Sequence, residues 1–313
     1  MKMKQLKTWA LVGAAFLAVA CGKDDNEGPH YKLNSFAIET ESPNTVNVLF
    51  QVKNSNNIGV TDLVSDDFYV KENGEELNAY ESDFTVEHFV NAQALKTVLL
   101  VDISKSIEPD LEDVKDALVS FVNAKTAYQE IAIYTFSSNS SKVIDFTKSK
   151  EALRAAISSI EIGTSSTNLY GSIINCANLW EDQYSLESVE LGNLIVLVDG
   201  NENQDLFELE DAEEAVEGRT VYILGVGTDY DPGIMRKLGD YYAANNINKL
   251  EGQILNIQDA ILKESESIYH AYYNSPKRGP NTHELRLHVR GNGNGGITGR
   301  IEGEFDSTLF EDE

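Results

Sequence analysis

Hydrophobic residues follow two different rhythms along the chain. Between residues 94 and 266, uninterrupted apolar runs alternate with stretches in which apolar residues recur every three or four positions. An apolar run without polar breaks is typical of a strand buried on both faces, whereas the wider spacing indicates an amphipathic helix. The runs that predict strands are Thr97–Ile103, Ile131–Phe136, Val143–Phe146, Leu194–Asp199 and Thr220–Val226.

Helices are expected between these strands. The segments with helical spacing are Pro109–Ala124, Lys150–Ile160, Leu169–Trp180, Leu209–Val216, Gly233–Leu238 and Ile254–Glu266. Strands that alternate with helices are joined by right-handed crossovers and form a mostly parallel sheet with helices on both faces. We therefore predict a doubly wound α/β domain over residues 94–266, in which the short Val143–Phe146 strand is an antiparallel edge.

The residues before this domain follow a period of two instead. Val46, Val48, Phe50 and Val52 alternate with Asn47, Leu49 and Gln51, which is close to a pattern with one apolar face. Asn73-Gly74 is a typical two-residue hairpin turn. We expect residues 31–93 to form a small antiparallel module that resembles a β-sandwich. No grouping of catalytic residues occurs in it.

The strand pattern returns after Glu266. Ser267–Tyr273 and Glu284–Arg290 are expected to be strands, and Gly291–Gly296 a flexible loop. The predicted α/β sheet has no need of these strands, so we expect residues 267–313 to complete the β module. A separate C-terminal pair of strands is the alternative.

The first twenty residues have the pattern of a secretory signal. Three lysines precede the apolar run Trp9–Ala20, which is too short to span a bilayer comfortably. The run ends in Leu-Ala-Val-Ala followed by Cys21, which resembles the lipobox of bacterial lipoproteins, where the cysteine becomes the lipidated N-terminus. We therefore expect a signal peptide over residues 1–20 and lipidation at Cys21. An ordinary cleaved signal with an incidental cysteine is the alternative.

Residues 21–30 are charged and poor in apolar residues, as expected of a flexible tether. Lys23-Asp24-Asp25 resembles a surface-export signal of some Gram-negative lipoproteins, although an ordinary acidic tether has the same composition. The expected location is the cell envelope, as an outer-membrane lipoprotein that is surface-exposed if the export signal is real.

Charge and residue usage narrow the classes of function. The 313 residues include 25 Lys and Arg against 51 Asp and Glu, a net charge of −26, so nucleic acid would be repelled. The contexts of Cys21 and Cys176 differ too much for a disulfide to be expected, and the apolar surroundings of Cys176 predict burial in a helix. The histidines lack the spacing of a zinc motif and are expected at the surface: His30, His88, His270, His283 and His288.

The end of the first buried run carries the candidate chemistry. Thr97–Ser106 reads TVLLVDISKS, so Asp102, Ser104 and Ser106 would lie at the carboxyl edge of the sheet. Open α/β sheets bind their ligands at this edge. Carboxylate and hydroxyl oxygens suit Mg²⁺, Mn²⁺ or Ca²⁺. The alternative is that Ser106 caps a helix that begins near Pro109.

Two later segments extend this pattern. Gly163–Ile173 reads GTSSTNLYGSI and contains Thr167, and Leu194–Gly200 reads LIVLVDG and contains Asp199. The order Asp-x-Ser-x-Ser, Thr, Asp resembles the von Willebrand factor A (VWA) domain and its metal-ion-dependent adhesion site, over roughly residues 94–266. We choose Thr167 over Thr164 because it directly precedes the predicted helix, as in the family pattern.

The resemblance implies a binding function. Ser104, Ser106 and Thr167 would coordinate a divalent cation, Mg²⁺ in the first place and Mn²⁺ or Ca²⁺ as alternatives, with Asp102 and Asp199 close by. An open position on the ion would accept an Asp or Glu from a partner protein. The sequence offers no base or nucleophile aimed at that position, so no enzyme is expected. A structural scaffold with a vestigial metal site and, further off, a metal-assisted hydrolase are the alternatives.

Overall fold

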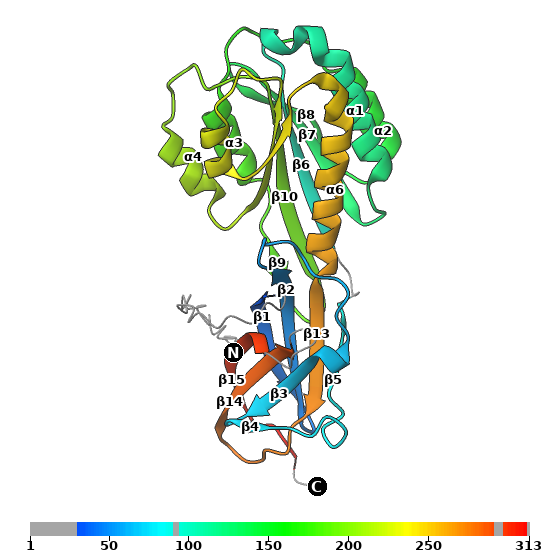
Figure 1. Cartoon of the computed structure of the whole chain (residues 1–313). Coiled ribbons are helices and arrows are strands. Elements are labelled where there is room, and N and C mark those ends of the chain that lie inside the picture. Colours follow the sequence, from blue (N-terminus) through cyan, green and yellow to red (C-terminus); the bar gives the residue numbers. More distant parts are fainter. Residues whose placement is uncertain (1–29, 90–93, 291–296, 312–313) are drawn as a thin grey trace, which may run out of the picture.

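The computed structural model describes residues 30–89, 94–290 and 297–311. Figure 1 shows two parts joined end to end, an α/β part that carries the helices and a β part that consists of two sheets. The chain enters the α/β part at strand β6 (Ala94–Asp102) and leaves it through helix α6 (Leu250–Glu266). The α/β part is therefore an insertion between strands of the β part.

The sheet of the α/β part is parallel at its centre. Its order is β12-β11-β10-β6-β7-β8, with the short β9 paired to β10. Only β8 and β9 run antiparallel to their neighbours. Besides β6, the strands are β7 (Gln129–Phe136), β8 (Ser140–Thr147), β9 (Gln183–Tyr184), β10 (Val189–Val198), β11 (Thr220–Val226) and β12 (Asp240–Ala244).

Helices cover both faces of this sheet. One layer consists of α1 (Leu111–Ala124), α2 (Lys150–Ser158) and α6, and the other of α3 (Leu169–Ala177), α4 (Leu209–Val216) and α5 (Pro232–Leu238). Strand β6 shows why an unbroken apolar run is required. Leu99 and Val101 pack with the first layer, whereas Val98 and Leu100 pack with the second. The predicted doubly wound, mostly parallel α/β fold is confirmed.

The β part contains two antiparallel four-stranded sheets. The first has the order β1 (Tyr31–Glu41), β2 (Thr45–Asn54), β13 (Ile268–Asn274), β5 (Thr85–His88), and the second β15 (Ile297–Asp306), β14 (Thr282–Arg290), β3 (Phe68–Glu72), β4 (Glu75–Glu76). Each sheet combines strands from both ends of the chain, since β13 pairs with β2 and β14 with β3. The inward residues of both sheets share one apolar core.

The two parts are firmly joined. Leu49 and Ile268 of the β part belong to the same apolar cluster as the first helix layer. The Gln51 side chain donates to the backbone oxygen of Glu264, at 3.0 Å, and Lys53 forms an ion pair with the Glu264 carboxylate. The end of α6 is therefore fixed against β2.

Several elements differ from those expected from the sequence. Strand β12 was not predicted, because Asp240–Ala244 is short and only its last residue is buried. Strand β15 was not predicted either, because Gly299 and Gly303 interrupt its pattern. A Cβ atom at Gly303 would lie 2.2 Å from Cδ1 of Ile38, so glycine lets β1 and β15 approach. Helix α3 ends at Ala177, earlier than expected, and 3₁₀ turns occur at Ser65–Asp67, Lys105–Asp110 and Ile247–Lys249.

His288 contradicts the expectation that all histidines lie at the surface. It is only 5% exposed, because its ring stacks on Tyr69 at a centroid distance of 4.6 Å. The signal peptide, Cys21, most of the tether and the Gly291–Gly296 loop lie outside the described residues. Within the described ranges, no helix is long and apolar enough to cross a membrane.

Candidate metal centre

Asp102 and Asp199 end up side by side because their strands are parallel neighbours. Asp102 is the last residue of β6, and Asp199 directly follows β10. The register pairs Val101 with Leu197, which brings the two carboxyl ends to the same level. Figure 1 shows this edge of the sheet at the end of the molecule farthest from the β part.

The two serines lie between these carboxylates. The backbone N–H of Ser104 donates to Oδ1 of Asp102, at 2.7 Å, and the Ser104 and Ser106 hydroxyl oxygens are 2.9 Å apart. Ser106 Oγ also donates to Oδ1 of Asp199, at 3.0 Å. Helix α1 begins after Asp110, with no side-chain cap. The alternative in which Ser106 caps this helix is therefore wrong.

The carboxylate of Asp102 is buried, and one of its oxygens lacks a hydrogen-bond donor among the described residues. Its residue is 1% exposed, and Oδ2 has no hydrogen-bond partner among the described residues. Burial, together with the charge of Asp199, raises the pKa of Asp102 to about 7, although the Ser104 N–H works in the opposite direction. Burial also raises the pKa of Asp199. In the described ranges, neither carboxylate forms an ion pair.

Backbone hydrogen bonds tie the loop that carries Thr167 to the loop after β6. The N–H of Gly163 donates to the oxygen of Ile103 at 2.8 Å, and the N–H of Lys105 donates to the oxygen of Thr164 at 3.1 Å. Thr167 is 4% exposed, whereas Thr164 is exposed. The structure therefore brings the Thr167 loop to the serine loop, but the two threonines differ in accessibility.

Asn203 holds Thr167 from the other side, and the sequence did not single it out. Its side-chain oxygen accepts from the Thr167 N–H at 2.8 Å, and its own N–H donates to the Thr167 oxygen at 3.1 Å. Asn168 caps helix α3 by accepting from the N–H of Gly171 at 3.1 Å. An Asn just after a predicted strand end and another at a predicted helix start were the available signals.

The donor set fits a hard divalent cation. Three hydroxyl-bearing residues and two carboxylates come from three loops at one sheet edge, and the unpartnered Oδ2 of Asp102 is a buried oxygen that needs a positive neighbour. The described residues contain no cluster of three or more His, Cys, Asp or Glu that could hold a metal. These residues therefore do not provide a site made of cysteine or histidine ligands. At the site described above, hydroxyl oxygens must supply part of the coordination.

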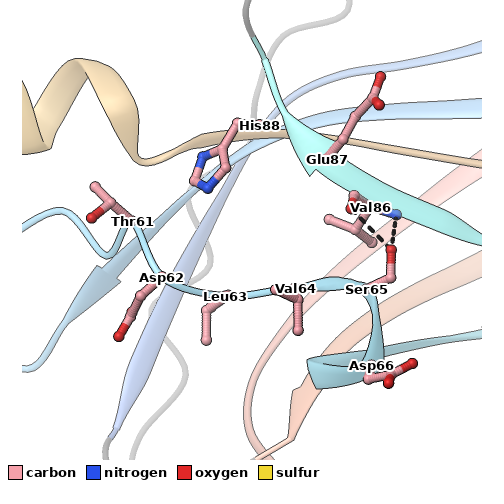
Figure 2. Close-up of a pocket in the computed structure, with 9 residues that line it drawn as sticks. All are labelled: Thr61, Asp62, Leu63, Val64, Ser65, Asp66, Val86, Glu87 and His88. Atoms are coloured by element: carbon pink, nitrogen blue, oxygen red, sulfur yellow. Dashed lines mark hydrogen bonds between the residues drawn. The ribbon is translucent and has the colours of Figure 1, made fainter.

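A hollow of the described structure lies elsewhere, in the β part. It measures about 600 Å³ and lies between Thr61–Asp66 and Val86–His88 (Figure 2). Figure 2 shows that the carboxylates lining it project in different directions. The His88 ring is held by a contact of 3.0 Å from Nδ1 to the Glu266 backbone oxygen. The hollow therefore presents no converging catalytic or metal-binding set.

Comparison with known sequences agrees with this geometry. Residues 97–202 match the sequence model of the von Willebrand factor type A domain family. The chain contains a VWA domain. The match includes all five proposed site residues of this VWA domain, but it covers only part of the α/β region. No curated protein matches the chain.

Solved structures with similar folds show low sequence identity. Proximal thread matrix protein 1 from the mussel byssus is 17% identical, with a TM-score of 0.48 over 56% of this chain and 49% of that one. BatB from Bacteroides thetaiotaomicron is 20% identical, with a TM-score of 0.47 over 56% of this chain and all of that one. A VWA protein from Catenulispora acidiphila covers 93% of this chain and 76% of its own, at 11% identity and a TM-score of 0.46. The chain thus spans about half of the mussel protein.

Proposed function

We propose that the VWA domain binds a protein partner through a divalent cation held by Asp102, Ser104, Ser106, Thr167 and Asp199. The single observation that carries this proposal is the Asp102 carboxylate, which is buried, lies against the Asp199 carboxylate and has one oxygen without a hydrogen-bond donor among the described residues. Such an arrangement is costly without a cation and is relieved by one.

The residues divide the work of holding the ion. The hydroxyls of Ser104, Ser106 and Thr167 are neutral ligands, while Asp102 and Asp199 neutralise the charge directly or through water. A site with so few charged ligands leaves the cation electrophilic, and the bound ion can then accept an Asp or Glu carboxylate from the partner. Mg²⁺ fits this set of hard oxygens, as do Mn²⁺ and Ca²⁺. A mussel protein of similar fold is described with a zinc-occupied site of this kind, so Zn²⁺ belongs in the same test.

The proposed role is adhesion or assembly in the cell envelope, with the chain anchored by lipid at Cys21. The lipobox-like sequence before Cys21 supports the anchor, and the acidic charge of the chain argues against a nucleic-acid partner. Changing Cys21 to Ala should move the protein from the membrane fraction to the soluble fraction. If the variant stays with the membrane, the lipid anchor is wrong.

The metal-dependent function can be tested on the full chain. Thermal melts with Mg²⁺, Mn²⁺, Ca²⁺, Zn²⁺ or chelator should show a metal-dependent rise in melting temperature. The immobilised chain should retain a partner from envelope extract with metal and release it with chelator. Asp199→Ala should lose both effects. A wild-type chain whose melt ignores every cation would overturn the proposal.

A further inference from the structure

The loop between β10 and α4 presents an apolar pair next to the proposed metal site. Leu206 is 59% exposed and Phe207 is 43% exposed. These are two of the few large hydrophobic side chains that the described part of the chain leaves in solvent. The loop follows Asp199 directly, and its Asn203 is hydrogen-bonded to Thr167. The loop therefore runs from the candidate metal centre to the apolar pair, which begins three residues after Asn203.

Two contacts hold the loop against helix α3, one before the apolar pair and one at Phe207 itself. The Glu202 carboxylate accepts from the backbone N–H groups of Tyr170, at 2.9 Å, and Gln204, at 2.8 Å. The Phe207 ring rests on Gly171, where a Cβ atom would lie only 2.8 Å from Cε2 of the ring. The structure thus fixes the loop while leaving Leu206 uncovered.

Acidic residues flank the apolar pair along the chain, and we call them the acidic rim: Asp205, Glu208, Glu210 and Asp211. All four are exposed. In the described ranges none of them forms an ion pair. The pKa of Tyr170 in helix α3 is raised, first by burial and then by the negative charges of Glu202, Glu210, Asp231 and Glu208. Two of these acids, Glu210 and Glu208, belong to the rim, so its charge acts on the neighbouring helix. A negative surface of this kind favours a positively charged partner.

We infer that this surface selects a protein segment in which the metal-binding Asp or Glu stands next to an apolar side chain and is flanked by Lys or Arg. The inference rests on the proposed function, because the carboxylate must reach the cation. The apolar side chain of the partner covers Leu206 and Phe207, and its basic side chains face the acidic rim. A uniformly acidic partner is excluded by repulsion, so the rim adds selectivity that the metal alone does not provide.

The probe is a displayed library of short random peptides, selected on the immobilised full chain with Mg²⁺ and recovered with chelator. The recovered peptides should combine Asp or Glu with a neighbouring apolar residue and with Lys or Arg. A resynthesised peptide should bind Leu206→Ala about tenfold more weakly than wild type, because an exposed apolar contact is lost. Leu309→Ala is the matched control, since Leu309 is 68% exposed in the β part, and it should not change binding.

The rim is tested with Asp205→Asn combined with Glu210→Gln. Asn tolerates the left-handed backbone of residue 205, whose φ is 50°. This variant should bind the peptide severalfold more weakly and with less dependence on salt. Glu75→Gln with Glu81→Gln removes two exposed charges of the β part and should leave binding unchanged.

The outcomes separate the two proposals. If none of Mg²⁺, Mn²⁺, Ca²⁺ and Zn²⁺ raises the melting temperature of wild type, the proposed function fails and this inference fails with it. If the rise persists but chelator releases no peptides, or the peptides lack basic residues, or Leu206→Ala binds like wild type, only the inference is overturned.

Discussion

Two buried polar side chains of the parallel sheet, Gln129 and Asp102, have different hydrogen-bonding environments. Near the amino ends of the strands, the buried Gln129 side chain donates to the Thr97 hydroxyl at 2.8 Å and accepts from the Gln258 amide at 3.1 Å. At the carboxyl end, the equally buried Asp102 has one oxygen that receives no hydrogen bond from the part of the chain that the structure describes. The first set is complete within the protein and stabilises the fold, whereas the second needs something from outside.

The largest difference between the two sites is expected when Asp102 is replaced. Binding of a cation to the folded state alone stabilises it by about 2.7 kcal/mol at a hundredfold excess over the Kd. Asp102→Ala should lose this gain, while its metal-free form should remain folded and be at least as stable as metal-free wild type, because a buried carboxylate is removed. Denaturant unfolding with Mg²⁺ and with chelator measures both. A variant that keeps the metal-dependent gain would show that the ion binds elsewhere.

The opposite result is expected at the amino end. Gln129→Ala leaves Thr97 and Gln258 with unmet hydrogen bonds, so the free energy of unfolding should fall by about 1–3 kcal/mol. The difference between melts with Mg²⁺ and with chelator should stay the same as in wild type. Loss of the metal response in this variant would mean that the two ends of the sheet are coupled.

The stability of the metal-free protein should also depend on pH. This effect is smaller than the stabilisation by the cation, and it reports the titration of Asp102. The pKa of Asp102 is raised to about 7 in the folded state. Between its unfolded value and this one, the folded protein holds a proton that the unfolded chain has released, so stability falls as pH rises toward 7. We expect a decrease of about 2 kcal/mol between pH 5 and pH 7.5, because nearly two pH units of this window lie below the raised pKa. Asp102→Asn is the control, and its curve should be flatter in this window.

The smallest effect is expected at the threonines. Thr167→Ala removes a neutral hydroxyl from the proposed site and should weaken partner binding, with metal still retained. Thr167→Ser keeps the hydroxyl and should restore binding. Thr164→Ala changes an exposed neighbour and should be neutral. Calorimetric titration with Mg²⁺ and partner retention on the immobilised chain distinguish these variants. Equal losses at both threonines would contradict the choice of Thr167.

The sequence predicted the elements whose burial is uniform. The runs around Leu99 and Val196 predicted parallel strands because both faces of those strands are covered. The strand that contains Gly299 and Gly303 was missed, since close approach of two sheets requires small residues and small residues resemble a loop. Tertiary contacts decided these positions, and no local pattern reports them.

The candidate site was predictable only in part. The spacing of Asp102, Ser104 and Ser106 followed from one strand end, and the family resemblance added Thr167 and Asp199. Asn203 was missed because its role depends on a loop returning from another strand, which spacing along the chain does not show. The assignment of these residues to a metal stays a prediction until the melts are measured.

The insertion of the VWA domain into the β part has a consequence for how such a chain can be built. The domain is entered after β5 and left before β13, and these strands are antiparallel neighbours with His88 opposite Tyr269. A tight turn could therefore replace the whole insert and close the gap as an ordinary hairpin. The β part could therefore accept a different domain at this position, provided that the two ends of that domain lie close together. The order of the strands in the β part would stay the same.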